Sequence, residues 1–304
     1  MVIYIMSIFT DKSKEEGNIA IGILPQELQS NLDDIYIEYY DIVPDKSSSI
    51  YHTFYYDLPI SLKTMIYEIQ ENTFWNKLCA DSCKKINVKE MDELYYSNFE
   101  KTASTVLSEN LYGATGNVVI HKDSHISTFD NVALYRVLIG VSPNENNNVI
   151  TKFTEFGEEK KINRGDYVIF DFSRTSHQVI KENPDENTPR VLLKLHFLIC
   201  DGCSDNYIYF LKNYFITYYN IMRYISKTGT DPTTFYSFFF GLLGHFYYYP
   251  NIEYIILSLI PLNISILKLR NIGDIIVYLP GSLMAVYLIV VYLYWMRYKL
   301  FGVR

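Results

Sequence analysis

The C-terminal quarter of the sequence contains three long runs without a charged residue. They cover residues 232–252, 254–267 and 275–296. A transmembrane helix needs about 20 consecutive apolar residues. The last run has 22 residues and ends in an aromatic and basic collar made by Tyr292, Tyr294, Trp295, Arg297 and Lys299. We therefore expect residues 231–304 to form a membrane region with one to three transmembrane helices, and a buried hairpin of a soluble protein is the alternative.

Charge separates this tail from the rest of the chain. Residues 231–304 carry five basic and three acidic side chains, a net charge of +2, and the whole chain has −7, so residues 1–230 carry −9. Hydrophobic residues make up 49% of the chain and the mean hydropathy is zero, which is too apolar for a wholly soluble protein. An acidic chain without a segment rich in Lys and Arg argues against nucleic acid as the main partner. The composition favours an acidic soluble part followed by a membrane anchor.

The cysteines and the first ten residues bear on the compartment. There are two closely spaced pairs, Cys79 with Cys83 and Cys200 with Cys203. A zinc site would need four thiolates from distant segments, so we expect reduced, partly buried thiols instead. Residues 1–10 have no basic leader, are too short for a secretory signal and predict a strand. These features favour a cytosolic soluble part, and the 29 tyrosines, with abundant Ile and Asn, are typical of AT-rich genomes such as those of large DNA viruses, which would place the protein at a viral or host internal membrane.

The first half of the chain changes its pattern near residue 60. Residues 1–60 show Tyr-rich apolar bursts, such as 35–40 and 51–56, which predict short strands or irregular packing. From residue 61 to about 108, apolar residues recur every three or four positions, which predicts two or three helices. The clearest are Leu62, Met65, Ile66, Ile69, Phe74, Trp75 and Leu78. We expect residues 1–110 to form a mixed and partly helical region that packs on the core.

From residue 117 the apolar period changes to two. It predicts five or so strands, at residues 118–123, 133–141, 149–156, 167–172 and 190–197. Turn clusters rather than helices separate them, which favours an antiparallel jelly-roll or barrel. One cluster contains Arg164-Gly165-Asp166, which we expect to be a turn and not an adhesion signal. The predicted fold class is α+β: a double-stranded β-helix (jelly-roll, cupin-like) core at 111–205 with N-terminal helices, an amphipathic aromatic linker helix at 206–230, and the helical transmembrane tail.

The residues most indicative of chemistry begin in the first of these strands. In an extended strand, positions i and i+2 point to the same side, so His121 and Asp123 project together. His177 lies just beyond the strand at 167–172 and is well placed to supply a third ligand. Two histidines and a carboxylate on one face of an octahedral metal form the facial triad of non-haem Fe(II) oxygenases. We therefore expect His121, Asp123 and His177 to be metal ligands and catalytic residues, with a hydrogen bond between His121 and Asp123 at a strand end as the alternative.

The last predicted strand carries one charged face. Arg190, Lys194 and His196 alternate with apolar residues that share the other face, namely Val191, Leu193, Leu195 and Phe197. Such a strand is typical of packing on the outside of a barrel and an anion site inside it. Because an arginine binds a carboxylate through two parallel hydrogen bonds, a dicarboxylic co-substrate could chelate iron at one end and meet Arg190 at the other.

The stretch 119–200, about a quarter of the chain, resembles the catalytic core of the aspartyl/asparaginyl beta-hydroxylase-like branch of the Fe(II)/2-oxoglutarate oxygenases. The matching residues are His121-x-Asp123, Arg136 in its strand, the run 165–171 that leads to His177, and Arg190. The resemblance implies Fe(II), 2-oxoglutarate and O2, with Arg190 on the distal carboxylate of 2-oxoglutarate and Arg136 holding the same co-substrate near the metal. Two departures stand out: the family often has a second histidine where this chain has Leu138, and the run 170–177 is one residue longer here.

Four further residues have simpler expected roles. His125 continues the His121 face but falls where a loop starts, which favours a supporting or surface role. Lys194 and His196 are expected at the rim of the barrel. His245 lies within an uncharged run that contains Gly241 and Gly244, and packing at a kink is expected there.

These patterns together predict a membrane-anchored Fe(II)/2-oxoglutarate-dependent dioxygenase that hydroxylates a C–H bond and forms succinate and CO2. Anchoring favours a substrate at the bilayer, either a lipid, which we slightly favour, or an Asp or Asn side chain of a membrane protein. Two alternatives belong to other classes. One is a non-catalytic, membrane-tethered jelly-roll binding domain with a degenerate metal site, and the other is a structural membrane protein whose soluble domain is a spacer.

Overall fold

The structure is a computed structural model, and it describes residues 18–43, 50–79, 83–97, 118–123, 131–143, 149–181 and 189–230. Residues 50, 118, 119, 121, 181 and 221–230 are described by their backbone alone. The chain divides into two compact units, Met1–Ile216 and Thr217–Arg304. The strand expected at 1–10 and the membrane region expected at 231–304 lie outside the described residues. Within the described ranges, no helix is both long and apolar enough to cross a bilayer.

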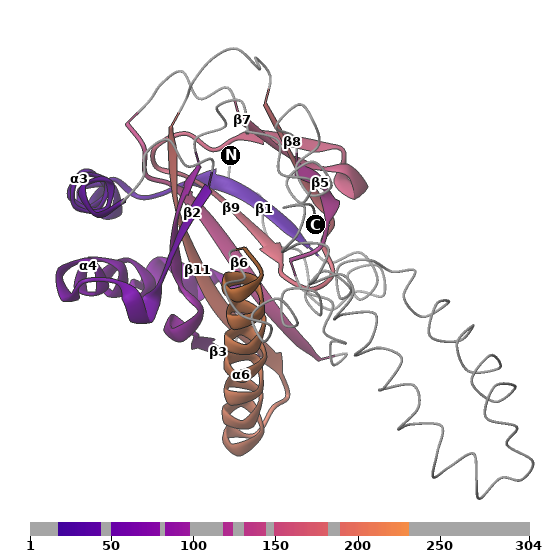
Figure 1. The fold of residues 1–304 in the computed structure, drawn as a ribbon. Helices are drawn as coiled ribbons and strands as arrows, with labels where there is room; N and C mark the ends of the chain where they lie inside the picture. The colour runs from indigo at the N-terminus through magenta and orange to yellow at the C-terminus, as the bar shows by residue number, and fades with distance from the viewer. Residues whose placement is uncertain are drawn as a thin grey trace, which may run out of the picture. The chain divides into compact units, whose positions relative to one another are not determined.

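Two antiparallel sheets form the core of the first unit (Figure 1). The larger sheet runs in the order β1 (Ile19–Ile23), β9 (Asp166–Asp171), β6 (Val132–Gly140), β11 (Arg190–Asp201), β4 (Glu93–Ser97) and β2 (Ile50–Phe54), and β3 (Cys83–Asn87) also pairs with β11. The smaller sheet runs in the order β5 (Val118–His121), β10 (His177–Lys181), β7 (Val149–Phe153) and β8 (Glu158–Lys161).

From β4 onward the chain passes back and forth between the sheets. β4, β6, β9 and β11 belong to the larger sheet, whereas β5, β7, β8 and β10 belong to the smaller one. This alternation of antiparallel strands is that of a jelly-roll and agrees with the core architecture expected from the period-two pattern. The sequence pattern does not reveal β8, because its residues Glu-Glu-Lys-Lys are polar and mostly exposed, and it does not reveal the short strand β10.

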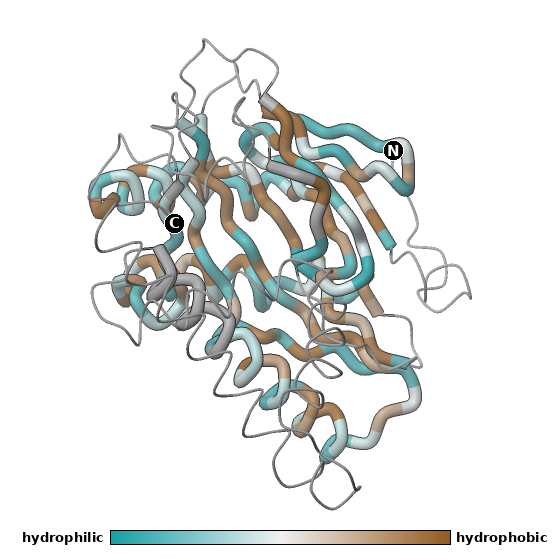
Figure 2. The backbone as a smooth tube through the Cα atoms, turned by 45° about the vertical axis from the view of Figure 1, so that its right-hand side comes forward, coloured by the Kyte–Doolittle hydropathy of each residue, from teal (hydrophilic) through white to brown (hydrophobic). Residues whose placement is uncertain are grey.

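Helices cover the outer face of the larger sheet. Apolar side chains of α2 (Gln26–Gln29), α3 (Leu32–Ile42), α4 (Ile60–Glu71) and the 3-10 helix η2 (Thr73–Leu78) form one buried cluster with it, and Figure 1 shows α3 and α4 together on one side of the sheet. Trp75 is completely buried there, with its ring 5.5 Å from that of Phe197 and its indole nitrogen donating to the carbonyl of Ile69 at 2.7 Å. Hydrophobic stretches along the central strands are visible in Figure 2.

The strand β11 separates two environments, as its alternating sequence predicts. Its residues Val191, Leu193, Leu195 and Phe197 belong to the outer cluster with the helices. Leu192 belongs instead to a second cluster with Phe153 of the smaller sheet and Phe170 of β9. Because alternate residues of a strand share a face, Arg190, Lys194 and His196 lie on the side of Leu192, between the sheets.

Two predictions for the N-terminal region are wrong. Residues 35–40, predicted as strand or irregular structure, lie in the helix α3, where Leu32, Ile35 and Tyr39 are buried at helical spacing. Of residues 88–107, predicted as helical, 88–97 hold the short 3-10 helix η3 (Lys89–Met91) and the strand β4, and 98–107 lie outside the described residues. β4 lies between two other strands and all five of its residues are buried, so its sequence shows no alternation that would mark it as a strand.

The expectation of reduced cysteines is also wrong. The structure joins Cys79 to Cys83 and Cys200 to Cys203 as disulfides. Their Cα atoms are 5.6 and 5.8 Å apart, within the range that a disulfide bridges.

The Arg164-Gly165-Asp166 triplet is a turn, as predicted. Gly165 has a φ of +80°, in the left-handed region that favours glycine. Arg164 pairs with Asp33 at 2.7 Å and Asp166 pairs with Lys160 at 2.9 Å, so both charges serve local packing.

The last described element is the helix α6 (Asp205–Thr230). In the part that belongs to the first unit, Ile208, Leu211 and Phe215 are buried, and Lys212 pairs with Glu90 at 3.2 Å. The opposite face exposes Tyr209, Phe210 and Tyr214.

Candidate active site

The charged side chains between the two sheets define the candidate site. They come from β2, β4, β6 and β11 of the larger sheet and from the ends of β5 and β10 of the smaller one. Cross-strand pairing places several of them side by side, since Lys194 is the direct partner of Glu93 and His196 is the direct partner of Arg136. Direct partners in an antiparallel sheet face the same side, so these four side chains form one inward-facing group.

Two of the three predicted metal ligands are brought together. Nε2 of His177 lies 3.8 Å from Oδ2 of Asp123. His177 is only 5% exposed, and its ring packs against the rings of Phe170 and Phe153, with centroid distances of 4.8 and 5.9 Å. The third predicted ligand, His121, is described by its backbone alone, which is the direct strand partner of His177.

A rigid turn leads into His177. The carboxylate of Asp171 accepts hydrogen bonds from the backbone nitrogens of Ser173 and Arg174 at 2.9 and 3.0 Å, and its second oxygen pairs with the Arg174 guanidinium at 2.8 Å. Arg174 also donates to the carbonyl of Val132 at 3.2 Å, which ties the turn to β6. The extra residue in the run 170–177 is therefore held in a well-bonded turn that places His177 at the start of β10.

Arg136 contacts the predicted metal-binding carboxylate itself. Its Nη1 lies 2.9 Å from Oδ2 of Asp123, and its Nε donates to Nε2 of His196 at 3.0 Å. The guanidinium also lies over the ring of Phe172, at 4.4 Å from the centroid. The role of Arg136 in holding the co-substrate stays a prediction, and the described partners of its guanidinium include Asp123 and His196.

A second charged group surrounds Glu93, a residue that the sequence pattern missed. Its carboxylate pairs with Lys194 at 2.6 Å and with Nδ1 of His52 at 3.3 Å, and Arg136 is 4.0 Å away. Burial alone would raise the pKa of Glu93, but Lys194, His52 and Arg136 lower it well below its usual range. Burial lowers the pKa of Lys194, and the adjacent Glu93 opposes this effect. Glu93 is thus an anion held between cations.

The predicted rim positions of Lys194 and His196 are wrong. The side chain of His196 is completely buried and Lys194 is only 9% exposed. His196 contacts Asp92, another residue that sequence reasoning missed, and its backbone nitrogen donates to Oδ1 of Asp92 at 2.8 Å. The sequence does not reveal these partners, because its pattern predicts a helix over residues 92–97. The alternation of charged and apolar residues on β11 is the sequence signal that indicates an inward-facing charged side.

Arg190 is a buried cation for which no ion pair is found among the described residues. It is 3% exposed, and neither its Nε nor its Nη1 has a hydrogen-bond partner among the described residues. Burial lowers its pKa to about 10, with the nearby Tyr95 opposing the effect. Both Arg190 and Asp123 act electrostatically on the Tyr95 hydroxyl, so they belong to the same interior region. A buried guanidinium with unpaired donors is costly in an apolar interior and suits an anionic ligand.

The donor types of these residues fit a metal and a dicarboxylate. Among the side chains that the structure describes, no three of the His, Cys, Asp and Glu type converge to hold a metal. Asp123 and His177 supply the oxygen and nitrogen donors of a facial triad, and Arg190 supplies the fork for a carboxylate. Across the interior, Arg136 faces Asp123 and Lys194 faces Glu93, whereas Nε and Nη1 of Arg190 have no hydrogen-bond partner among the described residues.

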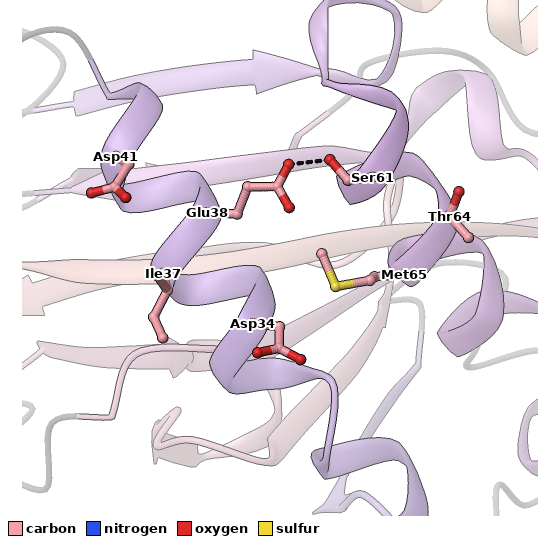
Figure 3. Close-up of a pocket in the computed structure, with 7 residues that line it drawn as sticks. All are labelled: Asp34, Ile37, Glu38, Asp41, Ser61, Thr64 and Met65. Carbon is pink, nitrogen blue, oxygen red and sulfur yellow. Dashed lines mark hydrogen bonds between the residues drawn. The ribbon is translucent and has the colours of Figure 1, made fainter.

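A surface groove lies elsewhere. It is lined by Asp34, Ile37, Glu38, Asp41, Ser61, Thr64 and Met65. Figure 3 shows it between α3 and α4, where Ser61 donates a hydrogen bond to Glu38. These helices lie on the outer face of the larger sheet, away from the charged interior, and no histidine or cationic residue lines the groove. His125 and His245 lie outside the described residues, so their expected roles stay predictions.

No protein-family model matches the sequence, and no curated protein matches it either. Solved structures with a similar fold are members of the 2-oxoglutarate–Fe(II) oxygenase family. One is a viral collagen prolyl hydroxylase from Paramecium Bursaria Chlorella virus-1 in complex with 2-oxoglutarate, with a TM-score of 0.37 and 15% identity over 60% of this chain and 96% of that one. No beta-hydroxylase is among those named here.

Two other solved structures are comparably similar. A Pseudomonas putida prolyl-4-hydroxylase has a TM-score of 0.31 and 11% identity over 63% of this chain and 97% of that one. HygX from Streptomyces hygroscopicus, with nickel and 2-oxoglutarate bound, has a TM-score of 0.38 and 7% identity over 62% of this chain and 84% of that one. Because all three TM-scores are below 0.5, the function proposed below rests on the side chains of the site.

Proposed function

We propose that this protein is an Fe(II)/2-oxoglutarate-dependent oxygenase that hydroxylates a C–H bond. When bound, Fe(II) and 2-oxoglutarate supply the oxidising chemistry and release succinate and CO2. The chain supplies donors for the metal from Asp123 and His177, with His121 as the third ligand. It also excludes water, because the charged interior lies between two apolar clusters.

The observation that carries this proposal is the buried guanidinium of Arg190, whose Nε and Nη1 have no hydrogen-bond partner in the part of the chain that the structure describes. Retaining an unpaired charge in an interior destabilises the folded chain, so a ligand that neutralises it explains why it is there. The other cations of the interior already have partners, since Lys194 pairs with Glu93 and Arg136 with Asp123. A dicarboxylic acid would supply a negative charge and hydrogen-bond acceptors for the donors of Arg190, of which Nε and Nη1 have no partner among the described residues.

The substrate proposed is a molecule at a membrane, either a lipid or an Asp or Asn side chain of a membrane protein. Two features support it: the uncharged runs after residue 231, and the aromatic face that α6 exposes shortly before them. Tyr209, Phe210 and Tyr214 are 65, 58 and 41% exposed, and aromatic rings of this kind favour the headgroup region of a bilayer. The resemblance to the beta-hydroxylase-like branch supports the peptide substrate, and the tail supports either.

The test is an anaerobic titration of the full-length chain in detergent with Fe(II) and 2-oxoglutarate, followed by the visible charge-transfer band of the chelate. We expect the band in the wild-type chain and in Arg164→Gln, an arginine already paired with Asp33. His177→Ala should lose the band. Arg190→Gln should bind 2-oxoglutarate at least about tenfold more weakly, because a hydrogen bond to a charged group contributes roughly 1.5–3 kcal/mol. A folded wild-type chain that shows no band would overturn the proposal.

One observation favours a metal-free binding domain instead. The ion pair between Arg136 and Asp123 neutralises the carboxylate that the metal would need. In such a domain, 2-oxoglutarate or another dicarboxylate would bind to wild-type protein in the presence of a chelator, with the same dependence on Arg190. Binding that strictly requires Fe(II) would exclude this second candidate.

A further inference from the structure

Four side chains form a continuous line from the core to Asp123. Oδ1 of Asp92 lies 3.4 Å from Nδ1 of His196, Nε2 of His196 accepts from Nε of Arg136 at 3.0 Å, and Nη1 of Arg136 lies 2.9 Å from Oδ2 of Asp123. Asp92 and His196 are both completely buried, whereas Asp123 lies past the end of β5 with its side chain 14% exposed. The line thus runs from the most enclosed part of the interior to the candidate metal ligand.

The chemistry of arginine fixes the direction of these hydrogen bonds. A guanidinium has only donors, so Nε2 of His196 must accept and the ring proton must sit on Nδ1. That proton points toward the carboxylate of Asp92, which holds the ring in this tautomer. Burial and the adjacent Arg136 lower the pKa of His196 well below its usual range, so the ring is neutral and keeps the lone pair that accepts from Arg136.

Contacts with several neighbours fix the orientation of the Arg136 guanidinium. Its Nε is bound by His196, its planar face lies on Phe172, and only the remaining edge is directed at Asp123. Because the guanidinium is planar, fixing Nε and the ring plane also fixes where Nη1 points. The cross-strand pairing of Arg136 with His196 provides the same constraint through the backbone.

We infer that His196, held by Asp92, is a positioning residue that orients Arg136 and through it the carboxylate of Asp123. The inference rests on the proposed function, in which Asp123 binds the metal. Outer partners of this kind typically change metal affinity by about 10- to 100-fold when they are removed. This inference assigns a role to two buried residues, His196 and Asp92, whose presence direct contact with the metal or the co-substrate would not explain.

The experiment compares two amides in place of His196 in the full-length chain. In His196→Gln, the side-chain oxygen can reach the place of Nε2 and still accept from Arg136. In His196→Asn, the shorter amide can reach only the place of Nδ1 and keeps the contact with Asp92. Arg164→Gln is the control, because Arg164 pairs with Asp33 and hydrogen-bonds to the carbonyl of Gln29, outside the charged interior.

Binding of Co(II) alone, read from its visible absorption and its dissociation constant, is the measurement. We expect His196→Gln and Arg164→Gln to stay within about threefold of wild type and His196→Asn to bind about 10- to 100-fold more weakly, with an altered spectrum. Equal affinities and spectra for the two His196 amides, whether both are wild-type-like or both weakened, would overturn the inference.

A wild-type chain that binds no Co(II) would remove the proposed function and leave the geometry to be tested separately. Crystal structures of the metal-free wild type and His196→Asn then decide. Displacement of Arg136 and of the Asp123 carboxylate in His196→Asn supports the positioning role, and unchanged positions of both overturn it.

Discussion

At the scale of single residues, replacing Arg190 should raise the stability of the ligand-free chain, whereas replacing Arg136 should lower it. Arg190→Met should raise the stability of the ligand-free chain by about 1–3 kcal/mol, because it removes a buried charge without a counterion and keeps the volume. Thermal and denaturant unfolding measure this, and 2-oxoglutarate binding should be lost in the same variant. A destabilised Arg190→Met chain would mean that the guanidinium has a stabilising partner.

Arg136→Met is the matched comparison. Here the substitution leaves Asp123 without its ion pair and Nε2 of His196 without a donor. We expect a loss of roughly 3–5 kcal/mol, the cost of breaking a buried pair by removing one partner. A loss below about 1 kcal/mol would show that Asp123 and His196 find other partners, against the orientation argued for Arg136.

The sequence predicts the interior site only in part. Residues that a pattern within one strand marks can be predicted, whereas residues whose partners lie on distant strands cannot. Asp123 and His177 follow from strand spacing, and Arg190 from the charged face of its strand. Glu93, Asp92 and His52 do not, because their importance comes from pairing between distant strands. Lys194 of β11 is the cross-strand partner of Glu93 in β4. Because the sequence pattern predicts a helix over residues 88–107, it shows no partner for Lys194 and wrongly predicts a position at the rim.

At the scale of elements, the close approach of β6 to a turn depends on Gly140. A Cβ built on Gly140 would lie 2.0 Å from the backbone oxygen of Asn163, and backbone cannot move aside as a side chain can. Gly140→Ala should therefore destabilise the chain by at least about 2 kcal/mol, as expected for overpacking. Equilibrium unfolding measures this change.

Gly157 provides the contrast for this prediction. Its φ is +67° but nothing lies within 4 Å of a Cβ built there. Gly157→Asn should be close to neutral, since Asn tolerates the left-handed conformation. Similar losses for Gly140→Ala and Gly157→Asn would argue against steric contact as the cause at Gly140.

The helix α3 is joined to the larger sheet by a buried hydroxyl that makes stability depend on pH. The Tyr39 hydroxyl donates to the carbonyl of Leu94 at 3.0 Å, and burial raises its pKa above the usual value. Below about pH 10 the tyrosine is protonated in both folded and unfolded chains, so its contribution is fully present. Above that pH only the unfolded chain loses the proton, so the free energy of unfolding falls as pH rises.

Tyr39→Phe isolates this effect from the other buried ionisable groups. The variant should be less stable at pH 7 by about 1 kcal/mol, the net contribution of a hydrogen bond. The gap between wild type and variant should narrow as the pH rises above 10. Unfolding curves at pH 7, 9, 10 and 11 give the comparison, and a gap that does not change with pH would contradict a raised pKa for Tyr39.

At the scale of the whole molecule, the aromatic face of α6 offers a test of the proposed membrane association. The full-length chain would be reconstituted in vesicles with brominated lipids, in a Trp295→Phe background that leaves the buried Trp75 as the native reference. A tryptophan introduced by Phe210→Trp should be quenched by the lipid, whereas one at Ile37→Trp, exposed on α3, should not. Equal quenching at both sites, or none at either, would exclude a specific role for the α6 face.

The jelly-roll core could be predicted from the sequence more completely than the N-terminal region. Period-two strands with turns between them define a jelly-roll, because one face of each strand must meet the other sheet. Two elements of the N-terminal region could not be predicted, for physical reasons. β4 is buried on both faces, so its sequence does not alternate. In α3, Ile35, Ile37 and Tyr39 fall at every second position, a spacing that a strand would also show.

The central position of β11 sets the order in which this molecule can acquire its chemistry. β11 pairs with β6, β4 and β3, elements that lie up to about a hundred residues earlier in the chain, and it carries Arg190, Lys194 and His196. Until it docks, β4 has no link to β6, and Glu93 and Arg136 lack their cross-strand neighbours. Closure of such distant pairs is the slow step in folding β-rich proteins. Competence to bind a ligand should therefore arise late and all at once, in the same kinetic phase that completes the larger sheet.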